Sequence, residues 1–132
     1  MSGGRTEVFK IYFDSESEGL KGRYLDFNSL YPFVQKYNKY PIGRVEFLNG
    51  DQVVQNIDKY FGVASVQIEA PSNLKIPVLP FRSNNKLMFP LCSSCALEKN
   101  NKSCNHASEK RDLFGCWVTE ELKLAVRYGY KI

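Results

Sequence analysis

The sequence predicts an α+β fold held in a single domain. Apolar residues that alternate with polar ones mark several strands, and apolar residues at helical spacing mark two or three helices. The chain has 132 residues, of which 43% are hydrophobic and 24% are charged. A chain of this length can bury about two-thirds of its unfolded surface, which provides for one modest core. This composition argues against intrinsic disorder over most of the length.

Residues 6–27 are expected to form an antiparallel hairpin. Residues 6–13 are rich in β-forming side chains with partial alternation, and residues 23–27 have the same character. A polar stretch with two glycines, residues 14–22, separates the two strands. Such a stretch is typical of a long hairpin loop.

The apolar spacing changes at Leu30 and predicts a helix. Leu30, Phe33, Val34 and Tyr37 fall at i, i+3, i+4 and i+7, which places them on one helical face. Pro32 lies in the first turn, where a missing N–H has little cost. We expect this helix to end before residue 40.

Residues 61–70 give the clearest strand pattern of the chain. Ala64, Val66 and Ile68 lie on one side of this strand, and we expect that side to be buried. Residues 86–90 are a second, shorter strand candidate. Together with residues 6–27, they predict an antiparallel sheet.

Two further helices are expected in the second half. Residues 51–60 are a short candidate, and a clearer helix begins at Thr119, which can cap it, and ends at Gly129. Its apolar face is expected to carry Leu122, Ala125 and Val126. Residues 130–132 then enter another strand.

The loop of residues 90–111 is polar and has no apolar periodicity, so it needs something other than a core to hold it. It contains three of the four cysteines and the only histidine: Cys92, Cys95, Cys104 and His106. Zn²⁺ prefers four thiolate or imidazole ligands in a tetrahedron, and a Cys-x-x-Cys turn places two sulfurs on one ion. The spacing therefore predicts a structural zinc site with no open position for a substrate.

Two disulfides, or free thiols beside a surface histidine, are the alternatives to zinc. The chain shows no signal peptide in residues 1–7, which disfavours disulfides. Cys116 lies in an apolar, strand-like stretch, residues 113–118, and is expected to be a buried small hydrophobic residue rather than a ligand.

The charge and hydropathy of the chain limit the classes of partner that we expect it to bind. No apolar run approaches the roughly 18 residues of a membrane span, so we expect an intracellular protein with no membrane partner. The net charge of +4 permits a nucleic-acid partner without requiring one.

Asp26 stands at the end of a predicted strand, directly before the turn that opens the first helix. A carboxylate in this place can hold Mg²⁺, while the backbone N–H groups of Asn28, Ser29 and Leu30 can receive phosphate oxygens. A helix cap or a solvated strand end explains the same spacing, so spacing alone leaves both possibilities open.

The complete string of residues 26–32, Asp-Phe-Asn-Ser-Leu-Tyr-Pro, resembles the first palm motif of family B DNA polymerases, D-x-x-S-L-Y-P, at every defined position. The surrounding chain is most similar to the protein-primed branch of viruses, organellar plasmids and self-synthesising transposons. Gly3 and Gly4 resemble the end of the Y-x-G-G linker of that branch, although its tyrosine is absent here. Residues 37–43 and the Cys/His segment also resemble its organellar and transposon members.

The resemblance implies a role for each residue of the motif. Asp26 would coordinate the catalytic Mg²⁺ ions, with the carbonyl of Phe27 as a further ligand. The amides of Ser29 and Leu30, with the Ser29 hydroxyl, would hold the incoming dNTP. Tyr31 would lie under its sugar and exclude a ribose. Gly3 and Gly4 would allow close approach of the DNA template.

The second catalytic carboxylate of the family, from a Y-x-D-T-D hairpin, is absent from this sequence, as is the finger-domain lysine motif. We therefore expect residues 1–132 to be one palm-type fragment of a DNA polymerase, inactive when isolated. Residues 1–42 would hold the linker end and the palm motif, and residues 43–132 the insertion and its return to the palm. Its partners would be template, primer, dNTP, the rest of the polymerase and a terminal priming protein.

A second hypothesis is a non-enzymatic, zinc-stabilised module that binds DNA or protein. Four basic residues surround the predicted zinc loop: Lys99, Lys102, Lys110 and Arg111. They are suited to phosphate contacts, but equally to ordinary solvation of a loop. The site of replication, whether nucleus, mitochondrion or viral factory, is left open by the sequence.

Overall fold

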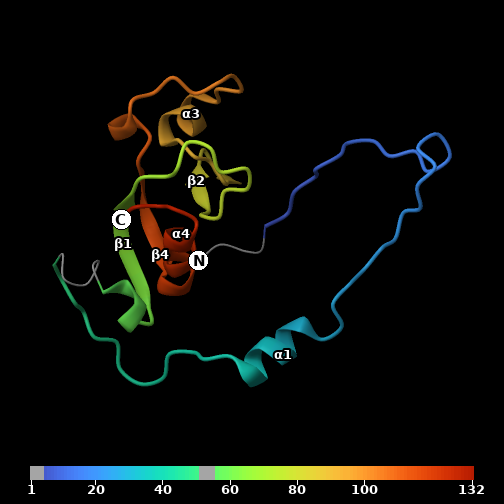
Figure 1. The fold of residues 1–132 in the computed structure, drawn as a ribbon. Helices are drawn as coiled ribbons and strands as arrows, with labels where there is room; N and C mark the ends of the chain where they lie inside the picture. Colours follow the sequence, from blue (N-terminus) through green and yellow to red (C-terminus); the bar gives the residue numbers. More distant parts are fainter. Residues whose placement is uncertain (1–4, 51–55) are drawn as a thin grey trace. The chain divides into compact units, whose positions relative to one another are not determined.

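The computed structural model describes residues 5–50 and 56–132 (Figure 1). The chain divides into two units between Ile42 and Gly43. The elements are α1 (Leu30–Tyr37), a 3₁₀ turn η1 (Ile57–Lys59), β1 (Val63–Ile68), β2 (Phe81–Ser83), β3 (Lys86–Met88), α3 (Ser93–Glu98), a 3₁₀ turn η2 (Ser108–Lys110), β4 (Leu113–Val118) and α4 (Thr119–Arg127). The fold is α+β with small antiparallel sheets, as the sequence predicts.

The predicted hairpin of residues 6–27 is wrong, because the structure places no strand in residues 5–50. The polar turn itself is present: the Glu18 amide donates to the Asp14 carbonyl at 3.1 Å, and the Asp14 carboxylate accepts from the Glu16 amide at 3.0 Å. The apolar side chains on either side are exposed, Ile11 by 98% and Leu25 by 85%. A hairpin without a buried face is marginal at best in water, which is why alternation alone failed here.

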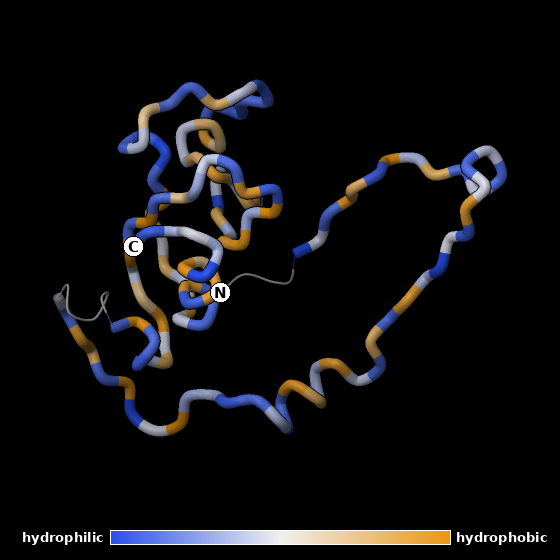
Figure 2. The backbone as a smooth tube through the Cα atoms, in the orientation of Figure 1, coloured by the Kyte–Doolittle hydropathy of each residue, from blue (hydrophilic) through white to orange (hydrophobic). Residues whose placement is uncertain are grey.

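The helix expected from Leu30 is confirmed as α1, and Pro32 lies in its first turn. The Asn38 amide donates to the Val34 carbonyl and ends the helix. Every residue of α1 is exposed, and the Phe33 and Tyr37 rings contact each other at a tilt of 47°, with centroids 4.9 Å apart. Figure 2 shows that hydrophobic residues recur along this unit. Its amphipathic pattern is therefore present without a core of its own.

The strand at residues 61–70 is confirmed as β1, which pairs with β4 in antiparallel register. Ile68 lies opposite Leu113, and both are fully buried; Ala64 lies opposite Trp117. The expected inner side is correct, with Ile68 buried and Ala64 and Val66 half-buried. Alternation succeeds here because a partner strand and a helix cover one side.

Helix α4 packs on the inner side of this sheet. Leu122 and Ala125 are fully buried in the same cluster as Ile68 and Leu113, but Val126 is 44% exposed, contrary to the predicted face. The cluster is completed by Ile57, Ala70, Leu79, Trp117 and Tyr130.

The predicted Thr119 cap is wrong. The N-cap position is Val118, and the Thr119 hydroxyl instead accepts a hydrogen bond from the Gly62 amide at 3.1 Å. This bond fastens the start of α4 to the start of β1. At the other end Gly129 has φ of +88°, a conformation that glycine adopts readily, and Lys131 then pairs with Glu69, as expected for the chain end.

The short strand expected at residues 86–90 is present as β3 and forms a hairpin with β2. Asn84 and Asn85 make the turn with φ of 48° and 61°. Two left-handed residues are what a tight hairpin turn requires, and Asn tolerates that conformation better than most residues. The Trp117 indole N–H donates to the Pro80 carbonyl at 2.8 Å and ties this hairpin to the core.

The structure differs from the sequence-based expectations at the metal-binding segment and at Cys116, and it describes only part of residues 51–60. Residues 92–111 carry α3 and η2, two short elements that the absence of periodicity did not indicate. Cys116 is exposed rather than buried, because it points to the outer side of β4. The helix expected at residues 51–60 lies partly outside the described residues, and its end is η1. None of the described helices is both long and apolar enough for a membrane span.

Candidate functional site

Cys92, Cys95, Cys104 and His106 come together in the second unit, as their spacing predicts. Their ligand atoms all lie within 4.8 Å of one another. His106 Nδ1 lies 3.5 Å from Cys92 Sγ, 3.3 Å from Cys95 Sγ and 3.6 Å from Cys104 Sγ. All four cysteines of the chain are free thiols, which rules against the disulfide alternative.

These distances fit a tetrahedral metal ion. An ion about 2.3 Å from each sulfur and about 2.0–2.1 Å from the nitrogen separates sulfur from nitrogen by about 3.5 Å. The three observed distances, 3.3–3.6 Å, cluster around that value. The Cys₃His group could therefore hold a metal ion such as Zn²⁺.

The Cys-x-x-Cys turn is built at the beginning of α3. Cys92 occupies the N-cap position, and its sulfur accepts a hydrogen bond from the Cys95 amide at 3.4 Å. The Asn100 side-chain amide also points at Cys95 Sγ, at 3.7 Å. These hydrogen bonds orient the two sulfurs at the start of α3, and a metal-bound sulfur can accept them as well.

His106 is oriented from its other side by an acidic residue. Its Nε2 lies 3.4 Å from the Glu98 carboxylate, at the last residue of α3. A metal ion held by Nδ1 would leave the ring proton on Nε2, where the Glu98 carboxylate can accept a hydrogen bond from it. Carboxylate–histidine pairs of this kind are common behind metal-bound imidazoles.

Two thiols of the metal-free cluster differ in acidity. The backbone amide and then the ring of His106 lower the pKa of Cys104 to about 6. Burial, followed by hydrogen bonds with Cys104 and Cys92, raises the pKa of Cys95 to about 12. The cluster thus keeps one thiolate and one thiol near neutral pH, and a bound cation would draw off the remaining protons.

The metal-binding segment is fastened to the core at its two ends. The Ser93 amide donates to the Arg111 carbonyl at 3.1 Å, and the Ser94 hydroxyl donates to the Lys110 carbonyl at 2.6 Å. The Arg111 guanidinium donates to the carbonyls of Ala70 and Leu91 at 3.4 Å and 3.3 Å. The segment is therefore a closed loop on the β1–β4 unit.

The Asp26 segment lies in the other unit. All residues of the motif are exposed, including Asp26, Phe27, Asn28, Ser29, Leu30 and Tyr31. The N-cap position of α1 is Ser29 rather than Asp26, and the Ser29 side chain, with φ of 58°, makes no cap hydrogen bond. The helix-cap interpretation of Asp26 is therefore wrong, whereas its exposure agrees with a solvated carboxylate as well as with a metal ligand.

Asp26 belongs to none of the groups of three or more potential metal ligands among the described residues, where the Cys/His cluster is the one such group. Gly3 and Gly4 lie outside the described residues.

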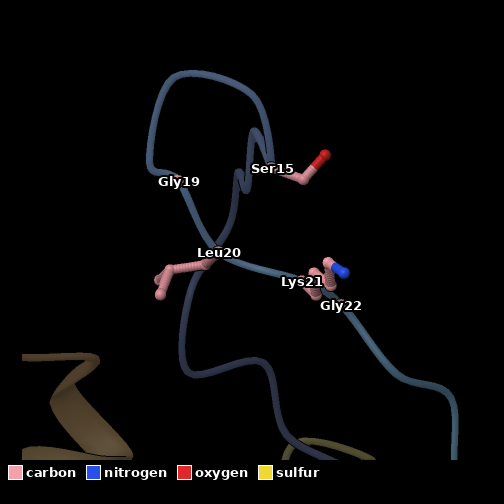
Figure 3. Close-up of a pocket in the computed structure, with 5 residues that line it drawn as sticks. All are labelled: Ser15, Gly19, Leu20, Lys21 and Gly22. Carbon is pink, nitrogen blue, oxygen red and sulfur yellow. The ribbon is translucent and has the colours of Figure 1, made fainter.

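A hollow of about 500 Å³ lies at the polar turn of the first unit (Figure 3). Its lining consists of Ser15, Gly19, Leu20, Lys21 and Gly22, and Leu20 points away from the polar groups of Ser15 and Lys21. A single lysine and a hydroxyl on an open turn form no site for chemistry.

Sequence patterns missed Glu98 and Asn100. Both belong to the short helix α3 or its end, and both face the sulfur and imidazole groups. The one indication in the sequence is that an acidic and an amide side chain lie between the predicted metal ligands. Without knowledge of α3, neither could be placed.

Three comparisons with known proteins bear on the family to which this chain belongs. The profile of the type B DNA polymerases of organelles and viruses matches residues 1–132. A relative from Neurospora intermedia is described as a probable DNA polymerase. It is 35% identical to this chain over an alignment of 141 positions, which covers 98% of this chain and 12% of the relative. No solved structure matches. The chain spans a small part of that relative, and it belongs to the organellar and viral type B DNA polymerase family.

Proposed function

We propose that this chain is the part of a DNA-directed DNA polymerase that supplies the first catalytic carboxylate. The observation that carries the proposal is the seven-residue string of residues 26–32 inside a chain that matches the family over its whole length. The exposure of Asp26 supports it, since a metal and a triphosphate need access to that carboxylate.

In this proposal the reaction is the transfer of a dNTP to a primer 3′-hydroxyl with two Mg²⁺ ions. Asp26 and the carbonyl of Phe27 bind the ions. The backbone N–H groups of Asn28, Ser29 and Leu30, at the start of α1, receive phosphate oxygens of the dNTP.

The remaining contacts are to the sugar and the template. Tyr31 packs under the sugar ring and excludes a ribose 2′-hydroxyl. Gly3 and Gly4 let the backbone approach the template strand. A second carboxylate and the triphosphate-binding lysine come from other parts of the polymerase, so the isolated chain has no activity.

Primer extension tests this function. In the intact polymerase that contains this segment, Asp26→Asn should reduce extension at least about 10³-fold, because neutralising a metal ligand removes transition-state charge stabilisation. Glu16→Gln, at an exposed carboxylate outside the motif, is the matched control and should leave the rate unchanged. The 132-residue chain alone should extend no primer. Extension by Asp26→Asn at the wild-type rate would refute the assignment.

We propose Zn²⁺ as the resident ion of the Cys₃His cluster, in a structural role. The four closed ligands and the fitting distances support this. Protein purified without added metal should contain about one equivalent of zinc by elemental analysis. A chain that is fully folded and free of metal would contradict the proposal.

We also propose that the polymerase is protein-primed, so that residues 43–132 approach a terminal protein as well as DNA. The support is the likeness of the chain to that branch. A non-catalytic zinc module remains the second candidate function, favoured by the Cys₃His cluster alone. DNA binding by this chain, together with normal extension by the Asp26→Asn polymerase, would favour the second candidate.

A further inference from the structure

A groove of about 530 Å³ lies between the β2–β3 hairpin and the metal-binding segment. We call it the knuckle groove. Apart from cysteines, its polar lining consists of Ser83, Asn84, Lys86, Lys99, Asn100, Asn101 and Lys102, and its apolar lining includes Met88 and Leu91. No aspartate or glutamate lines it.

The charge in the knuckle groove is positive and uncompensated. Lys86 comes from β3, whereas Lys99 and Lys102 follow α3, so the lysines stand on both walls. Within residues 5–50 and 56–132, none of the three makes an ion pair. Like charges gathered around one cavity repel each other, whereas an anion bound in that cavity would be attracted to all three lysines.

A buried hydroxyl in the same groove has no partner. Ser83 is only 6% exposed, and its Oγ forms no hydrogen bond with any described part of the chain. Buried polar atoms are almost always paired, because an unpaired one has lost its water without compensation. Ser83 therefore points, independently of the lysines, to a ligand with hydrogen-bonding atoms.

We propose that the knuckle groove binds the phosphodiester backbone of a single nucleic-acid strand. Lysine, asparagine and serine are residue types that contact phosphate and sugar, and here they surround one opening. The volume is in the range that holds a drug-sized ligand, about 300–1,000 Å³, so it admits a short piece of one strand rather than a duplex. The inference rests on the proposed function, which makes nucleic acid the partner rather than an acidic protein segment.

The knuckle groove and the Cys₃His cluster share three residues, so a bound metal ion would also shape the groove. Cys92, Cys95 and Cys104 line the groove as well as the cluster. The ion would thus fix the wall that carries Lys99 and Lys102 against the hairpin wall that carries Lys86. Strand binding should consequently require the metal-loaded chain.

Fluorescence anisotropy with a fluorescein-labelled dT₁₂ strand, titrated with the zinc-loaded chain at several salt concentrations, tests the proposal. A triple variant, Lys86→Gln/Lys99→Gln/Lys102→Gln, should weaken binding at least about tenfold. The slope of log K against log salt should also fall by about 2, since each phosphate contact to a single strand contributes about 0.7. A triple variant that binds like the parent chain would overturn the proposal.

A charge-matched control removes three lysines that do not line the groove, Lys59→Gln/Lys75→Gln/Lys131→Gln. It should keep the parent affinity at equal salt. If both triple variants lose affinity equally, binding follows net charge and the groove assignment is wrong.

Ser83→Ala separates binding from folding. It should weaken dT₁₂ binding about two- to tenfold, the range of one lost hydrogen bond, while raising the melting temperature, because it removes an unpaired buried hydroxyl. Unchanged affinity in this variant would contradict a ligand contact at Ser83.

An acidic competitor identifies the partner class. A twelve-residue poly-glutamate peptide should compete with dT₁₂ weakly, because it lacks the phosphate geometry and the sugar. Tighter binding of the peptide than of dT₁₂ would assign the groove to an acidic protein segment instead. Loss of strand binding concerns the groove alone, whereas primer extension by Asp26→Asn polymerase concerns the proposed function alone, so each can fail while the other stands.

Discussion

The His106 imidazole shows how one acidic residue sets the chemistry of the Cys₃His cluster. Its Nδ1 faces three sulfurs at 3.3–3.6 Å while its Nε2 faces Glu98 at 3.4 Å. The four ligands could be predicted from their spacing, because a Cys-x-x-Cys turn followed by Cys-x-His is itself a geometric pattern. Glu98 could not, since its position depends on the end of a six-residue helix that has no apolar periodicity.

Glu98→Gln should lower zinc affinity about 10- to 100-fold, the usual effect of losing a carboxylate behind a metal-bound histidine. The amide cannot attract the Nε2 proton as strongly, so the Nδ1 lone pair is less reliably directed at the ion. Competition with a chromogenic chelator measures the change. Glu109→Gln, an exposed acid in η2, is the control. Equal affinity of the two variants would show that Glu98 does not orient the ring.

Cys104 should be the most reactive thiol of the metal-free cluster. Because its pKa is lowered to about 6, its iodoacetamide alkylation should rise as the pH passes about 6 and level off above it. The sign for stability follows from a pKa that is lower in the folded chain than the ordinary value of 9.0. The contribution is complete above about pH 9, is present only in part at neutral pH, and is lost as the pH falls through about 6. Peptide mapping by mass spectrometry gives the rate. Bound metal should suppress it, and a half-rise above pH 8 would contradict the assignment.

Gly115 in β4 is required by a neighbouring ring. A Cβ there would meet Trp117 ring atoms at 2.8 Å and 3.0 Å, closer than real Cβ contacts. Gly115→Ala should therefore destabilise the chain by about 1–3 kcal/mol through overpacking. Gly62→Ala is the matched control, because its Cβ would meet nothing within 4 Å. Urea unfolding curves measure both, and equal midpoints would refute the contact.

Alternation predicted the elements correctly only where another element covers one side. The strand β1 could be placed because Ile68 and its neighbours face α4 and β4, whereas residues 6–27 alternate with nothing to cover them. The pairing of β1 with β4 joins residues 45 or more positions apart, from Ile68↔Leu113 outwards, and no local pattern encodes such a partner. The Thr119 cap failed for the same reason, since its hydroxyl bonds to the distant Gly62.

The helix α4 offers a paired test of which face is buried. Leu122→Ala should cost about 2–5 kcal/mol, because the side chain is fully buried and its removal leaves a cavity. Leu124→Ala, on the same helix but 45% exposed, should change the unfolding free energy by less than about 1 kcal/mol. Thermal and urea unfolding measure the difference. Similar losses for the two would mean that α4 packs through another face.

At the scale of the whole molecule, the two units differ in how they bury apolar surface. Among the described residues, nine buried ones form the core of the second unit, and the metal-binding segment is fastened to it. In the first unit, Tyr24 is 97% exposed, Phe27 79% and Tyr31 81%. The motif residues therefore lie on a segment that buries little apolar surface within the described part of the chain, and exposed apolar side chains gathered in this way are typical of a surface that contacts a partner.

Limited proteolysis should reveal this difference directly. Chymotrypsin should cleave the isolated chain first after exposed aromatic residues of residues 5–50, such as Phe9, Phe27 and Phe47, because local unfolding there costs little free energy. Bonds next to Trp117 and Tyr130, which are 3% exposed, should resist cleavage as long as the core is folded. Mass spectrometry of timed samples gives the order of cuts. In a parallel digest with trypsin, chelation of the metal should add early cuts after Lys99 and Lys102 while sparing the β1–β4 core. Protection of Phe27 equal to that of Trp117 in the chymotryptic digest would contradict the prediction.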